Sequence, residues 1–483
     1  MNPPTGPLTD HFSDTIVAIS TPPGISGIGI VRLSGPRAAE IAASVFRPAH
    51  PRKAVAEQPT YSLLYGHVMD GEERVDEALL TVMRAPHTYT TQDVVEINCH
   101  GGLIPLRRTL SLCLDAGARL ADPGEFTQRA FFFGRIDLAQ AEAVADLITA
   151  RTAEAARAAL SQLGGRLSAE IERLRQALVN VLAELEAQLD FGEDLEPHAE
   201  PAAPTPPLSR GGPPPQGAGW GPRLASLASE VAALLATAAQ GKLLRQGARV
   251  ALAGRPNVGK SSLMNALLGE ERMIVTAIPG TTRDTVEESL NLQGVPVVLV
   301  DTAGLREVKD EVEQAGVDRA RQALNEADVI LLLLDRSAPL QSEDEDLLET
   351  LAGPRTLVVL NKCDLPPASP SFPLYEADRE NPVEISALTH AGLDRLRGAI
   401  AERIGLAGEH AAEIIVTNAR HQQALEHALI SLQRAQSSAQ AGATEEYLAE
   451  DLRAALSSLG QITGATSPEE IVNQIFALFC VGK

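Results

Sequence analysis

The order of apolar and polar residues changes along the chain and predicts three kinds of segment. Between residues 1 and 128, short apolar runs at 15–19, 28–32 and 93–97 alternate with glycine and proline turns, which is typical of a compact α+β domain. From 139 to 191, and again from 418 to 460, apolar residues recur at helical spacing, which predicts amphipathic helices. The first helical stretch is interrupted only at Gly164 and Gly165, and the apolar run at 471–479 predicts a terminal helix.

Between the two helical zones, apolar runs at 250–253, 297–300 and 356–360 each precede a polar motif, as buried strands of a mostly parallel sheet do. The simplest architecture is a multidomain α/β and α fold. An N-terminal α+β domain (1–128) precedes a helical bundle made of 129–244 and 406–483, and an α/β domain (245–405) is inserted into that bundle. Residues 192–222 are rich in proline and have no hydrophobic period, which predicts a disordered or extended surface loop.

The most specific local pattern is the sequence GRPNVGKS at 254–261, which fits G-x-x-x-x-G-K-[ST] where a strand turns into a helix. Glycines at these positions allow backbone N–H groups to surround phosphate oxygens at the positive end of the helix. Lys260 would reach the β- and γ-phosphates, and Ser261 would place its hydroxyl on Mg²⁺. The pattern predicts a nucleoside triphosphate site.

Three further motifs follow in the order that a guanine-nucleotide switch requires. Asp301, in DTAG at 301–304, can hold the water shell of Mg²⁺, and GTTRD at 280–284 can supply a threonine hydroxyl to the metal. Asp364, in NKCD at 361–364, can accept two hydrogen bonds from guanine, and the sequence SAL at 386–388 follows another short strand. Adenine would leave that carboxylate unpaired. Together the motifs predict a GTPase domain of the Ras type.

The way in which this domain hydrolyses GTP is less ordinary. Ras-type GTPases orient the attacking water with a glutamine after the Asp-x-x-Gly motif, but this chain has Leu305 there. Two substitutes are visible: an acidic residue in the loop 306–313, or a monovalent cation held by Asn257 and by backbone carbonyls before Thr281. Both features also have simpler interpretations, because charged loops are commonly solvated and an asparagine can merely shape the turn.

Composition limits the partners of the chain. Among 483 residues the formal net charge is −22, which disfavours a broad nucleic-acid clamp, because phosphate neutralisation needs clustered Lys and Arg. If RNA is the substrate, a partner must supply much of the positive surface. Four widely spaced cysteines indicate reduced thiols in a cytoplasmic protein, and Cys480 is expected to be buried and inert. No run of about 18 apolar residues occurs, so no membrane contact is expected.

The chain resembles the MnmE (TrmE) family of tRNA modification GTPases over essentially its full length. The resemblance depends on short sequences that occur in order around the GTPase motifs. They are TPPG at 21–24, GIGIVR at 27–32, CHGG at 99–102, PGEFTQRAF at 123–131, RIDLAQAEA at 135–143 and FCVGK at 479–483.

The resemblance implies a homodimer whose N-terminal domains bind a 5-formyl-tetrahydrofolate-type cofactor. It implies a heterotetramer with the FAD-dependent partner MnmG that builds an aminomethyl or carboxymethylaminomethyl group on C5 of the wobble uridine of certain tRNAs. The tRNA would be bound largely through the partner. GTP hydrolysis in this family is stimulated by K⁺.

The resemblance also assigns roles to residues. It makes Glu313 the acid that orients the attacking water. Lys260 is the second catalytic residue. Mg²⁺ would be held by Ser261 and Thr282, and K⁺ by Asn257 with the backbone of Thr276, Ile278 and Thr281. The folate contacts are Arg32, Glu96, Arg135 and Lys483; the family usually has lysine at position 135, so that contact can shift. The GTP-binding residues are Asn257, Val258, Gly259, Lys260, Ser261, Ser262, Thr276, Thr282, Asp301, Thr302, Ala303, Gly304, Asn361, Lys362, Asp364 and Ser386.

Three rival functions remain at this point. A ribosome-assembly GTPase shares the leucine after Asp-x-x-Gly, but it is expected to carry a basic RNA-binding module with a GxxG loop, and no such module is recognised outside 245–405. A stand-alone one-carbon transferase would not need the complete GTPase motifs. A signalling or membrane switch would need an anchor.

Overall fold

The computed structural model describes residues 12–50, 54–191, 220–271, 287–301, 321–368, 382–406, 414–441 and 443–482. The contacts of the chain divide it into two compact units. Unit 1 comprises Met1–Ala145, Gln162–Pro206 and Thr444–Lys483, and unit 2 comprises Asp146–Ser161 and Pro207–Ala443. Each unit therefore combines segments that are far apart in the sequence.

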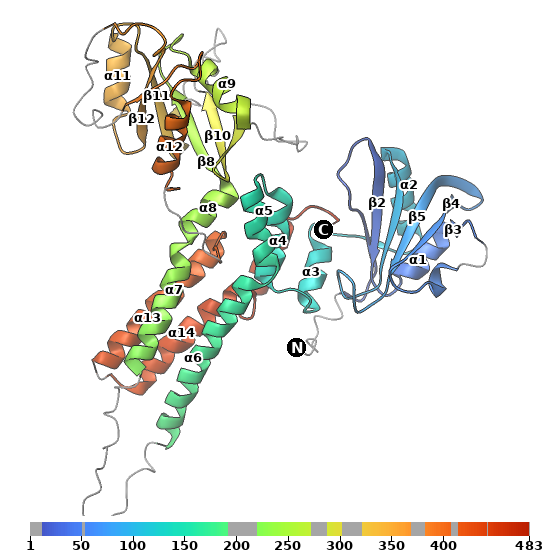
Figure 1. Cartoon of the computed structure of the whole chain (residues 1–483). Helices are drawn as coiled ribbons and strands as arrows, with labels where there is room; N and C mark the ends of the chain where they lie inside the picture. Colours follow the sequence, from blue (N-terminus) through green and yellow to red (C-terminus); the bar gives the residue numbers. More distant parts are fainter. Residues whose placement is uncertain are drawn as a thin grey trace, which may run out of the picture. The chain divides into compact units, whose positions relative to one another are not determined.

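The N-terminal part of unit 1 is a seven-stranded sheet with helices on one face (Figure 1). Neighbouring strands are antiparallel except β1 and β7. Helices α1 (Ala38–Val45) and α2 (Leu103–Asp115) cover the face that carries Leu33 and Ile97, and the predicted α+β domain is confirmed. In spatial order the strands are β3 (Phe46–Pro48), β4 (Ser62–Asp70), β5 (Glu73–Met83), β6 (Val94–Gly101), β2 (Ser26–Ser34), β1 (Ile16–Ile19) and β7 (Arg119–Leu120), and a 3₁₀ turn occupies Val55–Glu57.

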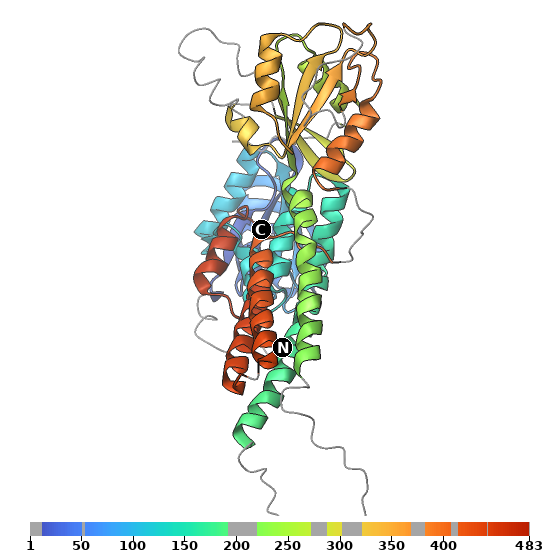
Figure 2. The same ribbon diagram turned by 90° about the vertical axis from the view of Figure 1, so that its left-hand side faces the viewer.

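The helices of unit 1 form two groups. α3 (Glu125–Phe132) and α15 (Glu469–Ala477) pack together with the first part of α4 (Leu138–Thr149) around one apolar cluster. α6 (Arg166–Phe191) packs along α14 (Glu445–Thr463) (Figures 1 and 2). The seam follows the alternating three- and four-residue spacing of a coiled coil. Its buried residues are Leu167, Ile171, Leu174, Leu178, Val181 and Leu185 on α6, and Leu448, Leu452, Ala455, Leu459 and Ile462 on α14.

In two places the structure breaks a helix that the pattern predicted as continuous. The stretch 139–191 is interrupted not only at Gly164 and Gly165 but also between α4 and α5 (Ala153–Leu163). There the Thr152 hydroxyl accepts a hydrogen bond from the Ala155 amide at 3.1 Å, which caps the new helix. The stretch 418–460 is two helices, α13 (Ala419–Gln440) and α14. Apolar periodicity continues across the first break, so it did not reveal the start of α5.

The helical part of unit 2 pairs α7 (Trp220–Ala236) with α13, and α8 (Ala238–Gln246) continues from α7 toward the inserted domain (Figures 1 and 2). In each of the two helix pairs, one helix comes from 129–244 and the other from 406–483, the two parts of the chain that were predicted to be helical. Of the predicted proline-rich segment 192–222, only the last three residues are described, and they begin α7. Pro222 is tolerated because the first turn of a helix needs no intrahelical N–H bond.

By length and composition, one helical stretch of the described residues could cross a membrane: Trp220–Gln246. Its apolar residues Leu224, Val231 and Leu234 are buried, on a helix that packs against α13. Helix packing within unit 2 accounts for this apolar composition.

The inserted α/β domain has a six-stranded sheet in the order β13-β12-β11-β8-β10-β9, with helices on both faces (Figure 1). All neighbouring strands are parallel except β9 and β10, which confirms the mostly parallel sheet. Its described strands are β8 (Ala248–Ala253), β9 (Glu287–Leu292), β10 (Val295–Asp301), β11 (Val329–Asp335), β12 (Thr356–Asn361) and β13 (Val383–Glu384). Its described helices include α9 (Lys260–Glu271), α11 (Ser342–Thr350) and α12 (Leu393–Arg403). In such sheets ligands bind at the carboxyl ends of the strands.

Candidate functional site

The loop between β8 and α9 has the shape that a phosphate cradle requires. Gly254, Asn257 and Gly259 have φ values of +142°, +66° and +101°, which turn the chain sharply and favour glycine or asparagine. Lys260 is 5% exposed, and its Nζ donates to the carbonyl oxygens of Gly254 and Arg255, each at 2.7 Å. The ammonium group is therefore held over the loop, next to the first turn of α9.

The predicted guanine-binding segment is hydrogen-bonded to this loop. Asn361 is 2% exposed, and its Nδ2 donates to the Val258 carbonyl at 2.8 Å while its Oδ1 accepts from the Ala387 amide at 3.0 Å. The Ser386 hydroxyl donates to Asp364 Oδ1 at 2.6 Å. Asn361 thus links the loop 254–261, its own motif at 361–364 and the segment 386–388. Ser386 orients the Asp364 carboxylate, which is predicted to bind guanine.

Gly259→Ala is expected to weaken GDP and GTP binding about tenfold or more. A Cβ at this position would lie 2.3 Å from Asn361 Nδ2, and strain at a positive φ costs on the order of 1–3 kcal/mol, where 1.4 kcal/mol is a factor of ten. Titration with a fluorescent guanine nucleotide measures the affinity. Gly269→Ala in α9 is the matched control, because its Cβ would meet nothing within 4 Å. Equal affinities of the two variants would contradict the packing argument.

The predicted metal side of the site is partly described. The Ser261 hydroxyl donates to Asp301 Oδ2 at 3.1 Å, so the end of β10 faces the first turn of α9. A hydroxyl and a carboxylate this close suit a hard cation such as Mg²⁺. Nine predicted residues lie outside the described residues, and their roles stay predictions: Thr276, Ile278, Thr281, Thr282, Thr302, Ala303, Gly304, Glu313 and Lys483.

Three of the four predicted folate residues meet in unit 1. Arg32 on β2 binds Glu96 on β6 through Nε at 2.8 Å, and the two side chains are 17% and 21% exposed. The guanidinium carbons of Arg32 and Arg135 lie 6.0 Å and 4.8 Å from the centre of the Tyr89 ring. Tyr89 was not predicted; it lies in a loop and belongs to no motif, so the sequence held no signal for it.

The C-terminal turn joins the same cluster. The Gly482 carbonyl accepts hydrogen bonds from the Ser20 hydroxyl at 3.2 Å and from Arg32 at 3.3 Å. The Gly124 amide donates to the Cys480 carbonyl at 3.3 Å. These contacts bring residue 482, next to the predicted Lys483, to the pair Arg32–Glu96.

The expectation of a buried Cys480 is wrong: this thiol is exposed, because α15 ends before it, at Ala477. The buried thiols are Cys99 and Cys113. Burial raises the pKa of Cys99 to about 11 and that of Cys113 to about 12, so both remain protonated at neutral pH.

Comparisons with known proteins agree along the whole chain. The family description "GTP-binding protein TrmE N-terminus" matches residues 15–135, and "MnmE helical domain" matches 138–480. A tRNA modification GTPase MnmE of Chloroflexus aurantiacus is 49% identical, covering 98% of this chain and 100% of the relative. MnmE proteins of Enterococcus faecalis and Geobacillus kaustophilus are 45% and 46% identical, each over 97% of this chain and 98% and 99% of the relative.

The chain belongs to the MnmE family. It is a tRNA modification GTPase. That the loop at 254–261 and the segments around Asn361 and Ser386 bind the GTP stays a prediction. The match over both the N-terminal and the helical parts favours this family over the ribosome-assembly alternative.

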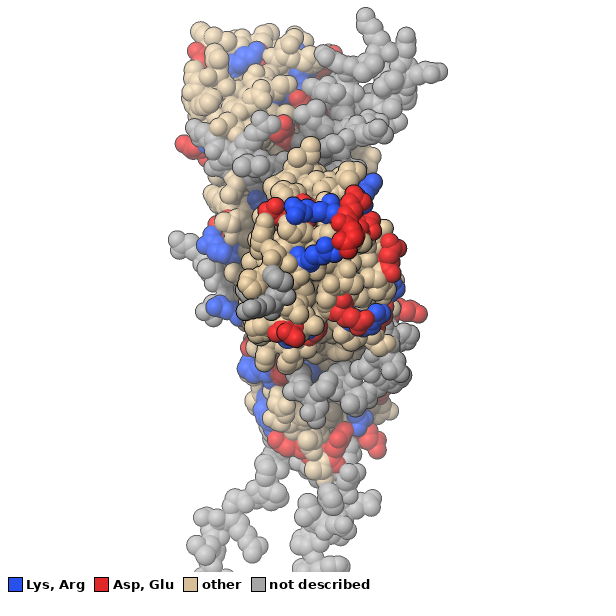
Figure 3. All heavy atoms as spheres, turned by 90° about the vertical axis from the view of Figure 1, so that its right-hand side faces the viewer, with Lys and Arg blue, Asp and Glu red and all other residues tan. Residues whose placement is uncertain are grey.

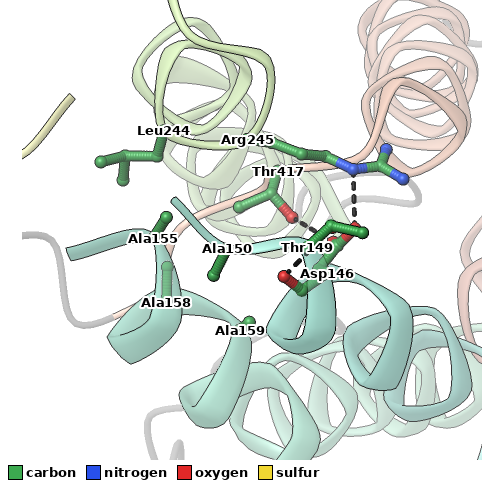
Figure 4. A pocket seen from close by; sticks show the side chains of 9 residues that line it. All are labelled: Asp146, Thr149, Ala150, Ala155, Ala158, Ala159, Leu244, Arg245 and Thr417. Atoms are coloured by element: carbon green, nitrogen blue, oxygen red, sulfur yellow. Dashed lines mark hydrogen bonds and ion pairs between the residues drawn. The ribbon is translucent and has the colours of Figure 1, made fainter. Parts of the chain in front are cut away.

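A small pocket of this MnmE-family chain lies away from the predicted site residues. In Figure 4, Arg245 at the end of α8 and Thr417 before α13 point toward Asp146. Asp146 Oδ1 accepts from Arg245 Nε at 2.8 Å, and Asp146 Oδ2 accepts from Thr417 at 3.4 Å. α8 leads into β8, and Thr417 follows the GTPase domain, so Asp146 holds both connections of that domain together. Small alanine side chains and Leu244 line the rest of the pocket, so we interpret it as a packing seam.

Proposed function

We propose that this chain hydrolyses GTP with stimulation by K⁺ and acts with the FAD-dependent partner MnmG. Together they would install the aminomethyl or carboxymethylaminomethyl group at C5 of the wobble uridine in certain tRNAs, using a folate one-carbon unit. The observation that carries the proposal beyond GTP hydrolysis is the approach of Arg32 and Arg135 to the Tyr89 ring, with Arg32 also bound to Glu96 and to the Gly482 carbonyl.

The side chains of this cluster fit a reduced folate of the 5-formyl-tetrahydrofolate type. The carboxylate of Glu96 can accept two hydrogen bonds from the amide N–H and amino group of a pterin. Arg32, Arg135 and Lys483 supply positive charge for the glutamate tail. A bound folate would supply the one-carbon unit, while these residues bind and orient it.

The proposed GTP mechanism assigns different tasks to the residues of the loop. Lys260 would neutralise charge on the β- and γ-phosphates, and Ser261 with Thr282 would hold Mg²⁺. The exposed Asn257, at a φ of +66°, would hold K⁺ with the backbone of Thr276, Ile278 and Thr281. Such a cation supplies positive charge where an arginine finger acts in other GTPases. Glu313 would orient the water that Leu305 cannot.

Glu313→Ala is expected to lower GTP turnover about 100-fold, the low end of general acid–base effects, with little change in GDP affinity. Replacing K⁺ with Na⁺ should lower the turnover of the unmodified protein to a similar degree. Glu311→Ala, in the same loop, is the control with the same change of charge. Single-turnover kinetics in both salts measures these effects. Normal turnover of Glu313→Ala would show that Glu313 is not the acid that orients the water. Equal rates in K⁺ and Na⁺ would contradict the proposed role of the monovalent cation.

The homodimer is proposed to form through the N-terminal sheet. Its helix-free face exposes Ile28, Leu63, Tyr65 and Leu79, and β4, β5, β6 and β2 are neighbours in the sheet. Exposed apolar area of this kind marks interaction surfaces.

The tRNA is proposed to bind largely through MnmG, in the cytoplasm and without a membrane. On the face drawn in Figure 3, basic and acidic side chains are interspersed among uncharged ones over the described surface. The net charge of −22 also favours binding of the tRNA through the partner, because strong tRNA binding needs clustered positive charge.

Nucleoside mass spectrometry of tRNA tests the proposed function. Cells lacking this chain should lose the C5-modified wobble uridine, and the unmodified gene should restore it. Glu96→Gln should fail to restore it although the purified variant hydrolyses GTP normally. Full modification without the chain would overturn the proposed function, and full restoration by Glu96→Gln would overturn the folate assignment.

A further inference from the structure

The stretch from the end of β11 to the first turn of α11 carries two carboxylates that belong to none of the nucleotide-binding motifs. Asp335 is the last residue of β11, and Asp344 lies in the first turn of α11. Both form ion pairs with basic residues of the GTP site.

Asp344 holds the phosphate loop from outside. It is 1% exposed, its Oδ1 accepts from Arg255 Nε at 2.6 Å, and its Oδ2 accepts from the Gln341 amide at 3.1 Å. The Arg255 carbonyl accepts from Lys260 Nζ at 2.7 Å. Arg255 is therefore fixed at both ends, and its guanidinium is committed to α11. A buried carboxylate of this kind is costly unless a cation pairs with it.

Asp335 holds the guanine-binding segment. Its Oδ2 accepts from Lys362 Nζ at 2.6 Å, and its Oδ1 accepts from the amide and the hydroxyl of Ser337 at 2.9 Å and 2.6 Å. Burial alone would raise the pKa of Asp335, but the hydrogen bonds from Lys362 and Ser337 outweigh it and lower the pKa. Lys362 has a φ of +66°, a conformation that surrounding contacts must stabilise.

We infer that Asp335 and Asp344 are positioning residues of the GTP site, which act through Lys362 and Arg255 respectively. One segment outside the motifs then holds both halves of the site: the loop that binds phosphates and the segment that binds guanine. The inference depends on GTP hydrolysis alone and is independent of folate, K⁺, MnmG and tRNA.

The two carboxylates should differ in their kinetic effect. Asp335→Asn is expected to raise the dissociation constants of GDP and GTP about tenfold and to leave kcat unchanged, because base contacts are the same in the ground and transition states. Asp344→Asn is expected to raise KM and also to lower kcat about tenfold, because Lys260 stabilises charge that develops on the phosphates. Asp346→Asn, an exposed position of α11, is the matched control and should behave as the unmodified chain.

Double variants distinguish positioning from a purely structural role. If Asp344 acts through Arg255, adding Arg255→Gln to Asp344→Asn changes kcat little further, and Lys362→Gln adds little to Asp335→Asn. Wild-type nucleotide affinity and kcat in both single variants would overturn the inference, even with a lowered Tm. Additive effects would also overturn it. If Asp344→Asn does not fold, Arg255→Gln is measured instead, because Arg255 is the less buried partner of the pair. Unchanged kinetics of Arg255→Gln would overturn the role of Asp344.

Discussion

Asp364→Asn is expected to lower GTP affinity by about 10³-fold or more and to create a preference for xanthosine triphosphate. The Ser386 hydroxyl donates to Asp364 Oδ1 at 2.6 Å, which fixes the plane of the carboxylate. An asparagine held in that plane directs its amide N–H groups toward the guanine amine, and two donors then face each other. Loss of a hydrogen-bond pattern of this kind is worth about 10⁴–10⁵ in other sites. Xanthine has a carbonyl oxygen in place of that amine and accepts from the new amide.

Competition of GTP and xanthosine triphosphate for a fluorescent nucleotide measures this exchange. Asp394→Asn is the matched control, since its side chain is 99% exposed on α12, and it should keep the preference for GTP. An Asp364→Asn variant that still prefers GTP would contradict the assignment of Asp364 to guanine, whatever its stability.

The sequence was most informative where the signal is local. The loop 254–261 contains its own chemistry, because the glycines, Lys260 and Ser261 are neighbours in the chain and require no knowledge of the tertiary fold. The parallel order of β8, β10, β11 and β12 then brings Asp301 and the motif that begins at Asn361 to the edge of the sheet where this loop lies.

Pairs of residues that are far apart in the sequence were harder to predict. Asp344 and Arg255 are separated by 89 positions, and an aspartate in the first turn of a helix predicts only a helix terminus. Tyr89 approaches Arg135 from a loop 46 positions away. Arg32, Glu96 and Arg135 were identified by resemblance, because isolated charges in a sequence are indistinguishable from solvated ones. The break before Ala153 was missed because one threonine cap leaves the apolar period intact.

The other large effect is expected at Arg129, in the sequence PGEFTQRAF. Its side chain is fully buried and binds Glu125 Oε1 at 2.8 Å, Gln92 Oε1 at 3.0 Å and the carboxylate of Asp14. Arg119 also binds Glu125, at 2.6 Å. This network joins α3 to the segment before β1.

Arg129→Met is expected to destabilise this region by about 3 kcal/mol, because removing one partner of a buried ion pair leaves the other uncompensated. Hydrogen exchange of the β1 and α3 amides should accelerate about 100-fold, since 1.4 kcal/mol is a factor of ten. Arg37→Met is the matched control, because Arg37 forms an exposed pair with Glu40 and such pairs contribute little. Equal exchange in both variants would show that the network does not stabilise the fold.

Lowering the pH should reduce the amide protection of β1 and α3 in the unmodified chain, as Arg129→Met does to a larger extent. Burial would raise the pKa of Glu125 and Asp14, but hydrogen bonds from Arg119 and Arg129 outweigh it and hold both below their ordinary values of 4.5 and 3.8. A carboxyl whose pKa is lowered by folding contributes its stability above the ordinary value and loses it as the pH falls through the lowered one. Protection of β1 and α3 should therefore decrease as the pH falls below about 4.5, and this dependence should be weaker in Arg129→Met. An identical pH dependence in both proteins would assign the acid sensitivity to other carboxylates.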